Sequence, residues 1–456
     1  MSDKSLEVLV YGLGAIGSFY AFILSRSEHV HLTVVARSNF EAVSANGISI
    51  DSQNHGKHHV KPHKVFRTVA EAGQKFDFII CTNKAVDQLS TAADIAPGVG
   101  NDTSIVIIQN GVGNEDAFRE KFPSATIISC VTWVGARQPE PGFIDHTTSE
   151  DMQVGLYPNE AGDESCDKEH LAQFESLLSI GKTIFQIVPN IQVQRWEKVV
   201  WNAAWNSLTA LTLMDTHAWL SSSDLSTPMT RKLMKEVIDV ANALGVPLGY
   251  ELIDRLLEKI LAMPPIGSSM RTDYENGKPM EVEVILGYPV RKGKELGIDV
   301  ATIETLYTIL LAINKRLISA QTLKKRVREL EAQLQQKGSY QLENLVGRIS
   351  DLEETVEGNQ EEAANQLKAS YQNSSAAWQV IEALQERIKS LENYCQLYCE
   401  QMIATRKEVK ELYNRQLEMM DGEETLEERI KMLEDPGNLL PLFQSGQISS
   451  VTMDTR

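Results

Sequence analysis

The chain has 456 residues, of which 42% are hydrophobic and 23% are charged, and its formal net charge is −18. This length exceeds what one hydrophobic core usually spans, so two or three domains are expected. The negative charge opposes both the phosphate backbone of nucleic acids and the anionic face of a membrane, so neither is an expected partner. Small molecules and other proteins remain as the expected partners.

The cysteines and the N-terminal segment indicate the compartment. Five cysteines occur without CxxC or zinc-type spacing, which favours a reducing environment. The first apolar run is short and leads directly into glycines, and no stretch reaches the roughly 18 apolar residues that a membrane helix needs. We expect a soluble, cytoplasmic protein.

The first part of the chain alternates apolar β-type runs with helical spacing. The β-type runs are 6–11, 31–36, 76–82, 104–108 and 126–131. Strands of this kind, separated by helical segments, are typical of a parallel sheet that is covered on both faces. The pattern predicts a doubly wound α/β domain over residues 1–188.

A glycine-rich turn directly follows the first predicted strand and opens a predicted helix. It reads Gly12-Leu13-Gly14-Ala15-Ile16-Gly17. In a GxGxxG turn of a Rossmann-type domain, the first glycine permits the turn, the second lets a pyrophosphate approach, and the third packs helix on strand. The alternative is a turn without a ligand, but the position between strand and helix favours a dinucleotide site.

The residue expected near the ribose is a cation. An NAD site usually presents an acidic side chain about 20 residues after the glycines, whereas this chain has Arg37 just after the second predicted strand. A guanidinium binds a 2′-phosphate through planar, charge-assisted hydrogen bonds, which favours NADPH. The alternative is a solvated loop arginine.

Two further loops close predicted strands with polar residues. Lys84 lies in the sequence TNKA and Asn110 lies in QNGVG. Ligands of open α/β sheets collect beyond the carboxyl ends of the strands, so we expect both loops to face the cofactor. Plain turns are the alternative.

Helical patterns replace the β-type runs after residue 188. Residues 229–244 and 303–317 keep helical spacing over several turns. We therefore expect a second, all-α domain over residues 189–320.

One stretch of this second region, EKVVWNAAWNSLT, is mostly apolar but keeps three polar side chains in register. Lys198, Asn202 and Asn206 recur at i, i+4 and i+8. At about 100° per residue they share one face of a helix. The alternative to a chemical role is a lysine that extends to solvent beside two structural amides.

Taken together, these motifs resemble the ketopantoate reductase (2-dehydropantoate 2-reductase) family. The resemblance rests on GLGAIG, TNKAVD, QNGVGNE, KVVWNAAWNSLTAL and SSMRTDYENGKPMEVEVILG, in the family's order over residues 1 to about 320. It implies a Rossmann-type domain that binds NADPH, a helical substrate domain, and reduction of 2-dehydropantoate (ketopantoate) to pantoate.

The resemblance also implies roles for individual residues. Lys198 would donate the proton, and Glu281 would orient this lysine and help to bind the cofactor. Substrate contacts are implied for Asn110, Lys198, Asn202, Asn206, Ser269 and Asp273. Cofactor contacts are implied for the six residues of the glycine turn and for Arg37, Lys84, Asn110, Ala136 and Glu281.

The chemistry agrees with these roles. Reduction of a 2-oxo acid places negative charge on the carbonyl oxygen, which an ammonium group can stabilise and protonate. Burial would lower the affinity of Lys198 for its proton and make it a better acid near neutral pH, while Glu281 would limit that shift.

Two other functions stay open. One is a reductase of another branched 2-oxo acid on the same architecture, and the other is a nucleotide-binding coiled-coil scaffold without catalysis. The joint presence of Lys198, Asn110, Ser269 and Glu281 argues against the scaffold, which has no need of them.

The sequence offers no convincing metal site. The histidines of NHGKHHVKPH are His55, His58, His59 and His63. We interpret this segment as a polar loop, and it has no carboxylate or cysteine partner at metal-site spacing. No metal ligand is expected.

The last part of the chain has a different periodicity. Apolar residues step by three and four from residue 342 onward, which predicts a coiled-coil extension over residues 321–435. Residues 436–456 lack periodicity and are expected to be a disordered tail. We expect the coiled coil to mediate homo-oligomerisation or to bind a protein partner; the alternative is a hairpin of two helical stretches.

Truncation after about Leu317 tests this expectation. Because apolar a and d positions associate with another helix, the truncated protein should have a lower oligomeric state by light scattering while its catalysis stays intact. An unchanged oligomeric state would contradict the association hypothesis.

Overall fold

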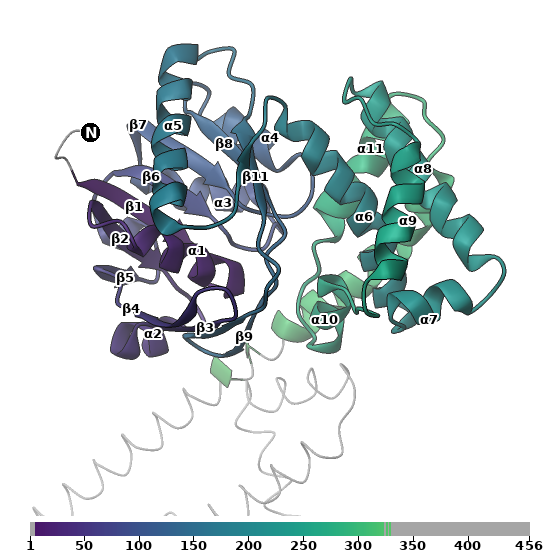
Figure 1. Cartoon of the computed structure of the whole chain (residues 1–456), viewed down its shortest axis with the longest axis horizontal. Helices are drawn as coiled ribbons and strands as arrows, with labels where there is room; N and C mark the ends of the chain where they lie inside the picture. Colours follow the sequence, from purple (N-terminus) through teal and green to yellow (C-terminus); the bar gives the residue numbers. More distant parts are fainter. Residues whose placement is uncertain (1–4, 323–324, 327, 330–456) are drawn as a thin grey trace, which may run out of the picture. The chain divides into compact units, whose positions relative to one another are not determined.

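An eight-stranded sheet flanked by helices forms the first part of the structure (Figure 1). The computed structural model describes residues 5–322, 325–326 and 328–329. The strand order is β12-β11-β8-β7-β6-β1-β2-β5. The strands are β1 Leu6–Tyr11, β2 Val30–Val35, β5 Lys64–Phe66, β6 Phe76–Cys81, β7 Val99–Ile107, β8 Ile127–Thr132, β11 Met152–Leu156 and β12 Gln186–Ile187.

Separate layers of helices cover the two faces of this sheet. The helices of this region are α1 Ala15–Ser25, α2 Phe40–Asn46, α3 Gln88–Ile95, α4 Asn114–Lys121 and α5 Glu164–Gly181. In β1, Val8 and Val10 belong to a core cluster with α1 and α5, whereas Leu9 and Tyr11 belong to one with α3 and α4. Successive side chains of a strand point to opposite faces, so the expected doubly wound arrangement is confirmed.

The strand order reverses beside β1. This strand pairs in parallel with β2 on one side and with β6 on the other. In an open α/β sheet, such a reversal leaves the ligand position at the carboxyl ends of the strands. The glycine turn, Arg37 and Lys84 follow β1, β2 and β6 respectively, so all three lie at that edge.

The sheet is mixed, which corrects the expectation of a parallel one. β11 pairs antiparallel with β8. Between them the chain forms β9 and β10, which belong to a second sheet of order β4-β3-β10-β9. The chain therefore returns to the first sheet without a crossover helix, and the antiparallel direction needs none. The strands of the second sheet are β3 Ile48–Ser52, β4 Gly56–Val60, β9 Ala136–Glu140 and β10 Phe143–His146.

The histidine-rich segment was wrongly predicted as a loop. Its residues Gly56–Val60 form β4, which pairs antiparallel with β3 and places His58 opposite Ile50. β4 is the edge strand of the small sheet and is mostly exposed. Its composition is polar because little of it is buried, so hydrophobic periodicity did not reveal it.

The second part of the structure is helical, as predicted. Its elements are α6 Ile191–Thr212, α7 Thr216–Ser221, α8 Ser226–Ala243, α9 Glu251–Ala262, α10 Ser269–Glu275, a π-helical turn η3 Glu283–Gly287, α11 Tyr288–Glu295 and a helix over 301–322. The Asn190 side chain caps α6 by accepting a hydrogen bond from the Gln192 amide at 3.1 Å. Leu213, with a φ of 57°, ends this helix.

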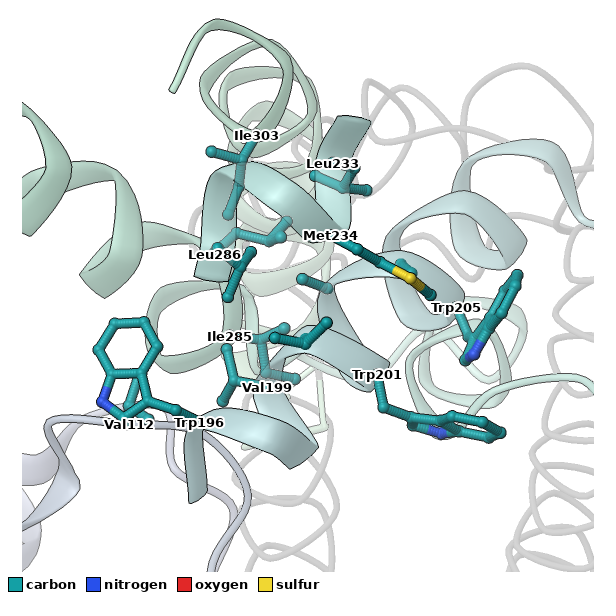
Figure 2. Close-up of a cluster of buried hydrophobic side chains, with 14 of the residues drawn as sticks. Val112, Trp196, Val199, Trp201, Trp205, Leu233, Met234, Ile285, Leu286 and Ile303 are labelled. Atoms are coloured by element: carbon teal, nitrogen blue, oxygen red, sulfur yellow. The ribbon is translucent and has the colours of Figure 1, made fainter. Parts of the chain in front are cut away.

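The core of the helical part is built around α6. Most residues of α6 are buried, and they pack against α8, η3 and the helix that contains Ile303. Figure 2 shows Val199 beside Ile285, with Trp196 on one side of the cluster and Trp201 and Trp205 on the other. The apolar residues of α6 therefore form the centre of the hydrophobic core of the helical part.

Parts of the predicted organisation lie outside the described residues. The described chain up to Leu317 forms one compact unit. The coiled coil expected over 321–435 and the tail over 436–456 fall outside the described residues, apart from short helical pieces before 330. The predicted boundaries of the domains stay predictions. Within the described ranges, no helix is long and apolar enough to cross a membrane.

Candidate active site

The glycine turn has the geometry that its sequence predicts. Gly12 has a φ of +96°, and a Cβ there would lie 2.5 Å from the Asn83 backbone nitrogen. A Cβ on Gly17 would lie 2.1 Å from the Gly12 carbonyl oxygen, so this position also excludes a side chain. A Cβ on Gly14 would meet nothing within 4 Å, and no side chain caps α1. The turn therefore leaves room for a phosphate before the first amides of α1.

The other residues of the turn are held by the surrounding structure. Leu13 is buried, and its carbonyl oxygen accepts a hydrogen bond from Asn39 Nδ2 at 2.5 Å. Ala15 begins α1. Ile16 and Ala136, the first residue of β9, are both partly buried against the core cluster that contains α1. Ala136 thus packs on the face of the large sheet that α1 covers.

The Arg37 side chain is exposed but contacts two polar side chains. Its Nη2 donates to the Tyr11 hydroxyl at 2.5 Å and lies 3.4 Å from Asp94 Oδ2, while 71% of its side chain is exposed. The Tyr11 hydroxyl donates to the same Asp94 oxygen at 2.6 Å. Burial and this carboxylate raise the pKa of Tyr11 to about 12. Asp94, on α3, is an acidic neighbour of Arg37 that sequence reasoning missed.

Hydrogen bonds join the loops after β6 and β7 to the helical part. Lys84 forms an ion pair with Asp273 on α10. The Glu281 carboxylate accepts from the Ala85 amide and from Asn110 Nδ2, both at 3.0 Å. Burial raises the pKa of Asp273, and the Lys84 charge opposes this rise. Predicted residues from three distant segments therefore form one network.

Lys198 lies on α6 at this junction. Its ammonium donates to the backbone oxygen of Thr132 at the end of β8, and Nζ lies 5.0 Å from the centroid of the Trp133 ring. Burial lowers the pKa of Lys198 to about 7; the Glu281 carboxylate opposes this, and the Arg195 charge adds to it. Lys198 is thus a half-buried ammonium group that can lose its proton near neutral pH.

The remaining predicted substrate residues are less connected. Asn202 and Asn206 are buried on α6, and within the described chain Asn202 Nδ2 has no hydrogen-bond partner. Ser269 is exposed at the first turn of α10, where Ser268 is the capping residue. No hydrogen bond among the described residues links Asn206 or Ser269 to the Glu281 network. Their predicted roles rest on position alone.

A buried ion pair one helical turn before Lys198 was missed from the sequence. Arg195 and Glu115 have side chains that are 1% and 0% exposed, and Arg195 Nε lies 2.7 Å from Glu115 Oε1. The guanidinium also donates to four backbone oxygens at the ends of β7 and β8, those of Ile107, Gln109, Gly111 and Cys130, at 2.9 to 3.3 Å. Two features of the sequence could have indicated this pair. Arg195 lies three residues before Lys198 and so on a similar face of the helix, and Glu115 is the glutamate of the QNGVGNE motif.

Comparison with known proteins agrees with this geometry. The family description "Ketopantoate reductase PanE/ApbA" matches residues 8–159, and its C-terminal counterpart matches residues 190–314. The chain belongs to the ketopantoate reductase family. As a member, it is an oxidoreductase of a family whose description names ketopantoate, a small 2-oxo acid, as the substrate.

Individual ketopantoate reductases are similar over about two thirds of the chain. The crystal structure of 2-dehydropantoate 2-reductase from Methylococcus capsulatus matches with 34% identity and a TM-score of 0.61, over 68% of this chain and 98% of that one. The 2-dehydropantoate 2-reductase of Nostoc sp. is 25% identical, over 67% of this chain and 94% of its own. D-mandelate dehydrogenase, solved with NADH and anilino(oxo)acetate, shares the fold, with 22% identity, a TM-score of 0.61, and coverage of 68% and 99%.

The residues around this reductase site do not include a metal-binding group. In the part of the chain that the structure describes, no three His, Cys, Asp or Glu side chains are arranged to hold a metal ion. His55 is instead bound to Glu150 at 2.9 Å.

Arg195→Met tests how strongly the buried pair holds this reductase together. The substitution leaves the Glu115 carboxylate buried without its partner, so the free energy of unfolding should fall by about 3–5 kcal/mol in a denaturant titration. The double variant Arg195→Met/Glu115→Gln should recover part of the loss, because no uncompensated charge remains.

The matched control is Arg137→Met. Arg137 pairs with Asp145 at 2.7 Å on the surface, where such a pair contributes about 0–1 kcal/mol. If Arg195→Met destabilises the protein no more than this control does, the buried pair does not have the structural importance assigned to it.

Proposed function

We propose that this protein reduces 2-dehydropantoate to pantoate with NADPH, and that Lys198 donates the proton. The observation that carries the proposal is the position of Lys198. Its ammonium lies at the junction of the sheet and the helical part, near the Glu281 carboxylate, with a pKa lowered to about 7. A general acid is most effective when its pKa is close to the working pH.

The cofactor supplies the hydride, and the chain supplies its binding site. The open space in front of Gly14 and the uncapped start of α1 suit a pyrophosphate. Arg37 lies at the end of β2, where its guanidinium suits the 2′-phosphate of NADPH. Lys84 and the loop of Asn110, at the same edge of the sheet, and Ala136, which packs against the core cluster that contains α1, complete the proposed cofactor contacts.

Lys198 serves two purposes in the proposed reaction. Its positive charge stabilises the negative charge that develops on the carbonyl oxygen, and its proton is then transferred to that oxygen. Glu281 keeps enough negative charge nearby for the lysine to stay protonated, and it also holds Asn110 by a hydrogen bond of 3.0 Å. Glu281 thus couples the acid to the loop that approaches the cofactor.

Neutral side chains hold the substrate in this proposal. Asn202 and Asn206 lie on the same face of α6 as Lys198, and the buried Nδ2 of Asn202, which has no partner among the described residues, would donate to a substrate oxygen. Ser269 and Asp273 approach from α10. Lys84 pairs with Asp273 and reduces the repulsion between this carboxylate and an anionic substrate.

A second candidate keeps the reaction and changes the substrate to another 2-oxo acid. The observation that favours it is a pair of aromatic rings beside Lys198. Trp133 lies against the Lys198 ammonium, and the ring centroids of Trp133 and Trp201 are 6.1 Å apart. An apolar side chain larger than that of 2-dehydropantoate would find contacts there. An NADPH-oxidation assay with a panel of 2-oxo acids distinguishes the two candidates.

The proposal includes the compartment and the pathway. Cys81, Cys130 and Cys166 are free thiols, which suits the reducing cytoplasm. With 2-dehydropantoate as substrate, the product enters pantothenate biosynthesis.

Lys198→Ala tests the assignment of the acid. Turnover should fall by roughly 10²-fold or more, because the variant lacks both the proton source and the charge that faces the developing alkoxide. NADPH affinity should change little, since the proposed phosphate and ribose contacts come from other residues. Near-normal turnover of Lys198→Ala on every 2-oxo acid of the panel would contradict the proposed mechanism.

The pH dependence of kcat/KM provides an internal control for this variant. The ammonium is the active form for reduction, so activity should be level below about pH 7 and fall as the pH rises through the lowered pKa of Lys198. In Lys198→Arg the guanidinium stays protonated, so any residual activity should lack this decline. An unchanged decline in Lys198→Arg would assign it to another group.

Arg37→Ala tests the cofactor preference. Removal of a charge-assisted hydrogen bond to the 2′-phosphate should weaken NADPH binding by roughly 10-fold or more and leave NADH binding nearly unchanged. Fluorescence titration with both cofactors measures this. Asp94→Asn is the matched variant: because Asp94 competes for Arg37 at 3.4 Å, its neutralisation should tighten NADPH binding. Equal affinities of the wild type for both cofactors would contradict the NADPH assignment.

A further inference from the structure

A second lysine lies against the aromatic residues beside Lys198. Lys259, in the last turn of α9, places Nζ 4.5 Å from the centroid of the Trp133 ring and 5.3 Å from that of Trp201. Lys198 Nζ lies 5.0 Å from the same Trp133 centroid. Ammonium groups from α6 and α9 therefore both lie near the indole ring of Trp133. Trp133 itself follows β8, so Lys259 also reaches from the helical part to the sheet.

The charge of Lys259 is not neutralised by the described residues around it. Its neighbours on α9 have partners: Arg255 pairs with Glu197 at 2.7 Å, and Asp254 pairs with Arg231 at 2.7 Å. Among the described residues, no carboxylate lies within ion-pair distance of Lys259. An ammonium group without a carboxylate partner is stabilised by an anion that binds it, so Lys259 can attract an anionic ligand to the ring of Trp133.

The adjacent face of α6 presents further donors without acceptors. Asn202 is buried and its Nδ2 has no hydrogen-bond partner in the described chain, and the same holds for Trp205 Nε1. Figure 2 shows Trp201 and Trp205 on the same side of the core cluster. A buried donor without an acceptor is unfavourable, so a ligand that brings oxygen acceptors is favoured here. Cations and donors together indicate an anionic ligand rich in oxygen.

We propose that Lys259 binds the carboxylate of the 2-oxo acid whose carbonyl oxygen Lys198 protonates. The inference rests on the proposed reduction and specifies its substrate class, namely 2-oxo acids in their anionic form. Neutral 2-oxo amides or esters lack the charge that Lys259 recognises. The indole rings of Trp133 and Trp201 hold the exposed ammonium in place by cation–π contact. Lys259 takes no part in proton transfer.

A purely structural role makes a different prediction. The aliphatic stem of Lys259 covers part of two tryptophans, and this packing stabilises the junction without any ligand. Lys259→Met keeps an unbranched apolar stem and removes only the charge. Lys259→Arg keeps the charge and the cation–π geometry.

The experiment compares an anionic ligand with a neutral one of the same shape. In Lys259→Met, the KM for the 2-oxo acid and the inhibition constant of the 2-hydroxy acid product should each rise about 10-fold or more, the effect of losing a hydrogen bond between charged groups. The inhibition constant of the corresponding 2-hydroxy amide should stay unchanged, and kcat should change far less than KM. Lys259→Arg should remain close to the wild type.

Lys235→Met is the matched control. Lys235 is also an exposed lysine over an aromatic ring, 5.2 Å from the centroid of Tyr250, and it pairs with Asp239 at 2.7 Å. This variant should leave both inhibition constants unchanged. If Lys259→Met alters the constants of the acid and the amide by the same factor, or alters neither, Lys259 is structural and the inference is wrong. Failure of the proposed function itself is seen separately, as retained turnover in Lys198→Ala.

Discussion

The buried guanidinium of Arg195 is the interaction on which the arrangement of the site depends. A charge that is removed from water must be paired and hydrogen-bonded, and Arg195 meets this requirement with Glu115 and four backbone oxygens at the carboxyl ends of β7 and β8. These bonds attach α6 to the sheet at the edge where an α/β sheet holds its ligands. Lys198 follows one helical turn later, so the same contacts determine where its ammonium lies.

The burial of α6 connects stability with chemistry. Val199 and Val200 pack in the core of the helical part, and Lys198 lies next to them in sequence but faces Thr132 and Trp133. The packing that stabilises the helix also removes water from the ammonium, and this lowers its pKa to about 7. Glu281 limits the effect. The fold thus sets the acidity of the proposed catalytic group through ordinary core packing.

Close backbone contact completes the junction. Gly111 has a φ of +94°, and a Cβ there would lie 2.5 Å from the side chain of Val284 in η3. The Val112 amide donates to the Val284 carbonyl oxygen at 3.0 Å, and Asn110 binds Glu281. The glycine thus lets the loop after β7 touch the π-helical turn. Groups from both parts of the chain are held within hydrogen-bond distance, which a site for a cofactor and a substrate requires.

The sequence by itself determined the features that depend on neighbours along the chain. The strands around β1, the turn from Gly12 to Gly17 and the polar stripe of Lys198 and Asn202 were all predictable, because periodicity and glycine conformations are local properties. Only the tertiary structure decided the antiparallel direction of β11, the strand β4, the pairing of Arg195 with Glu115, the contact of Asp94 with Arg37 and the position of Lys259 on Trp133. These features join residues that are distant in sequence. Their energies come from desolvation and pairing in the folded core, and no local pattern reports which distant partner the fold brings into contact.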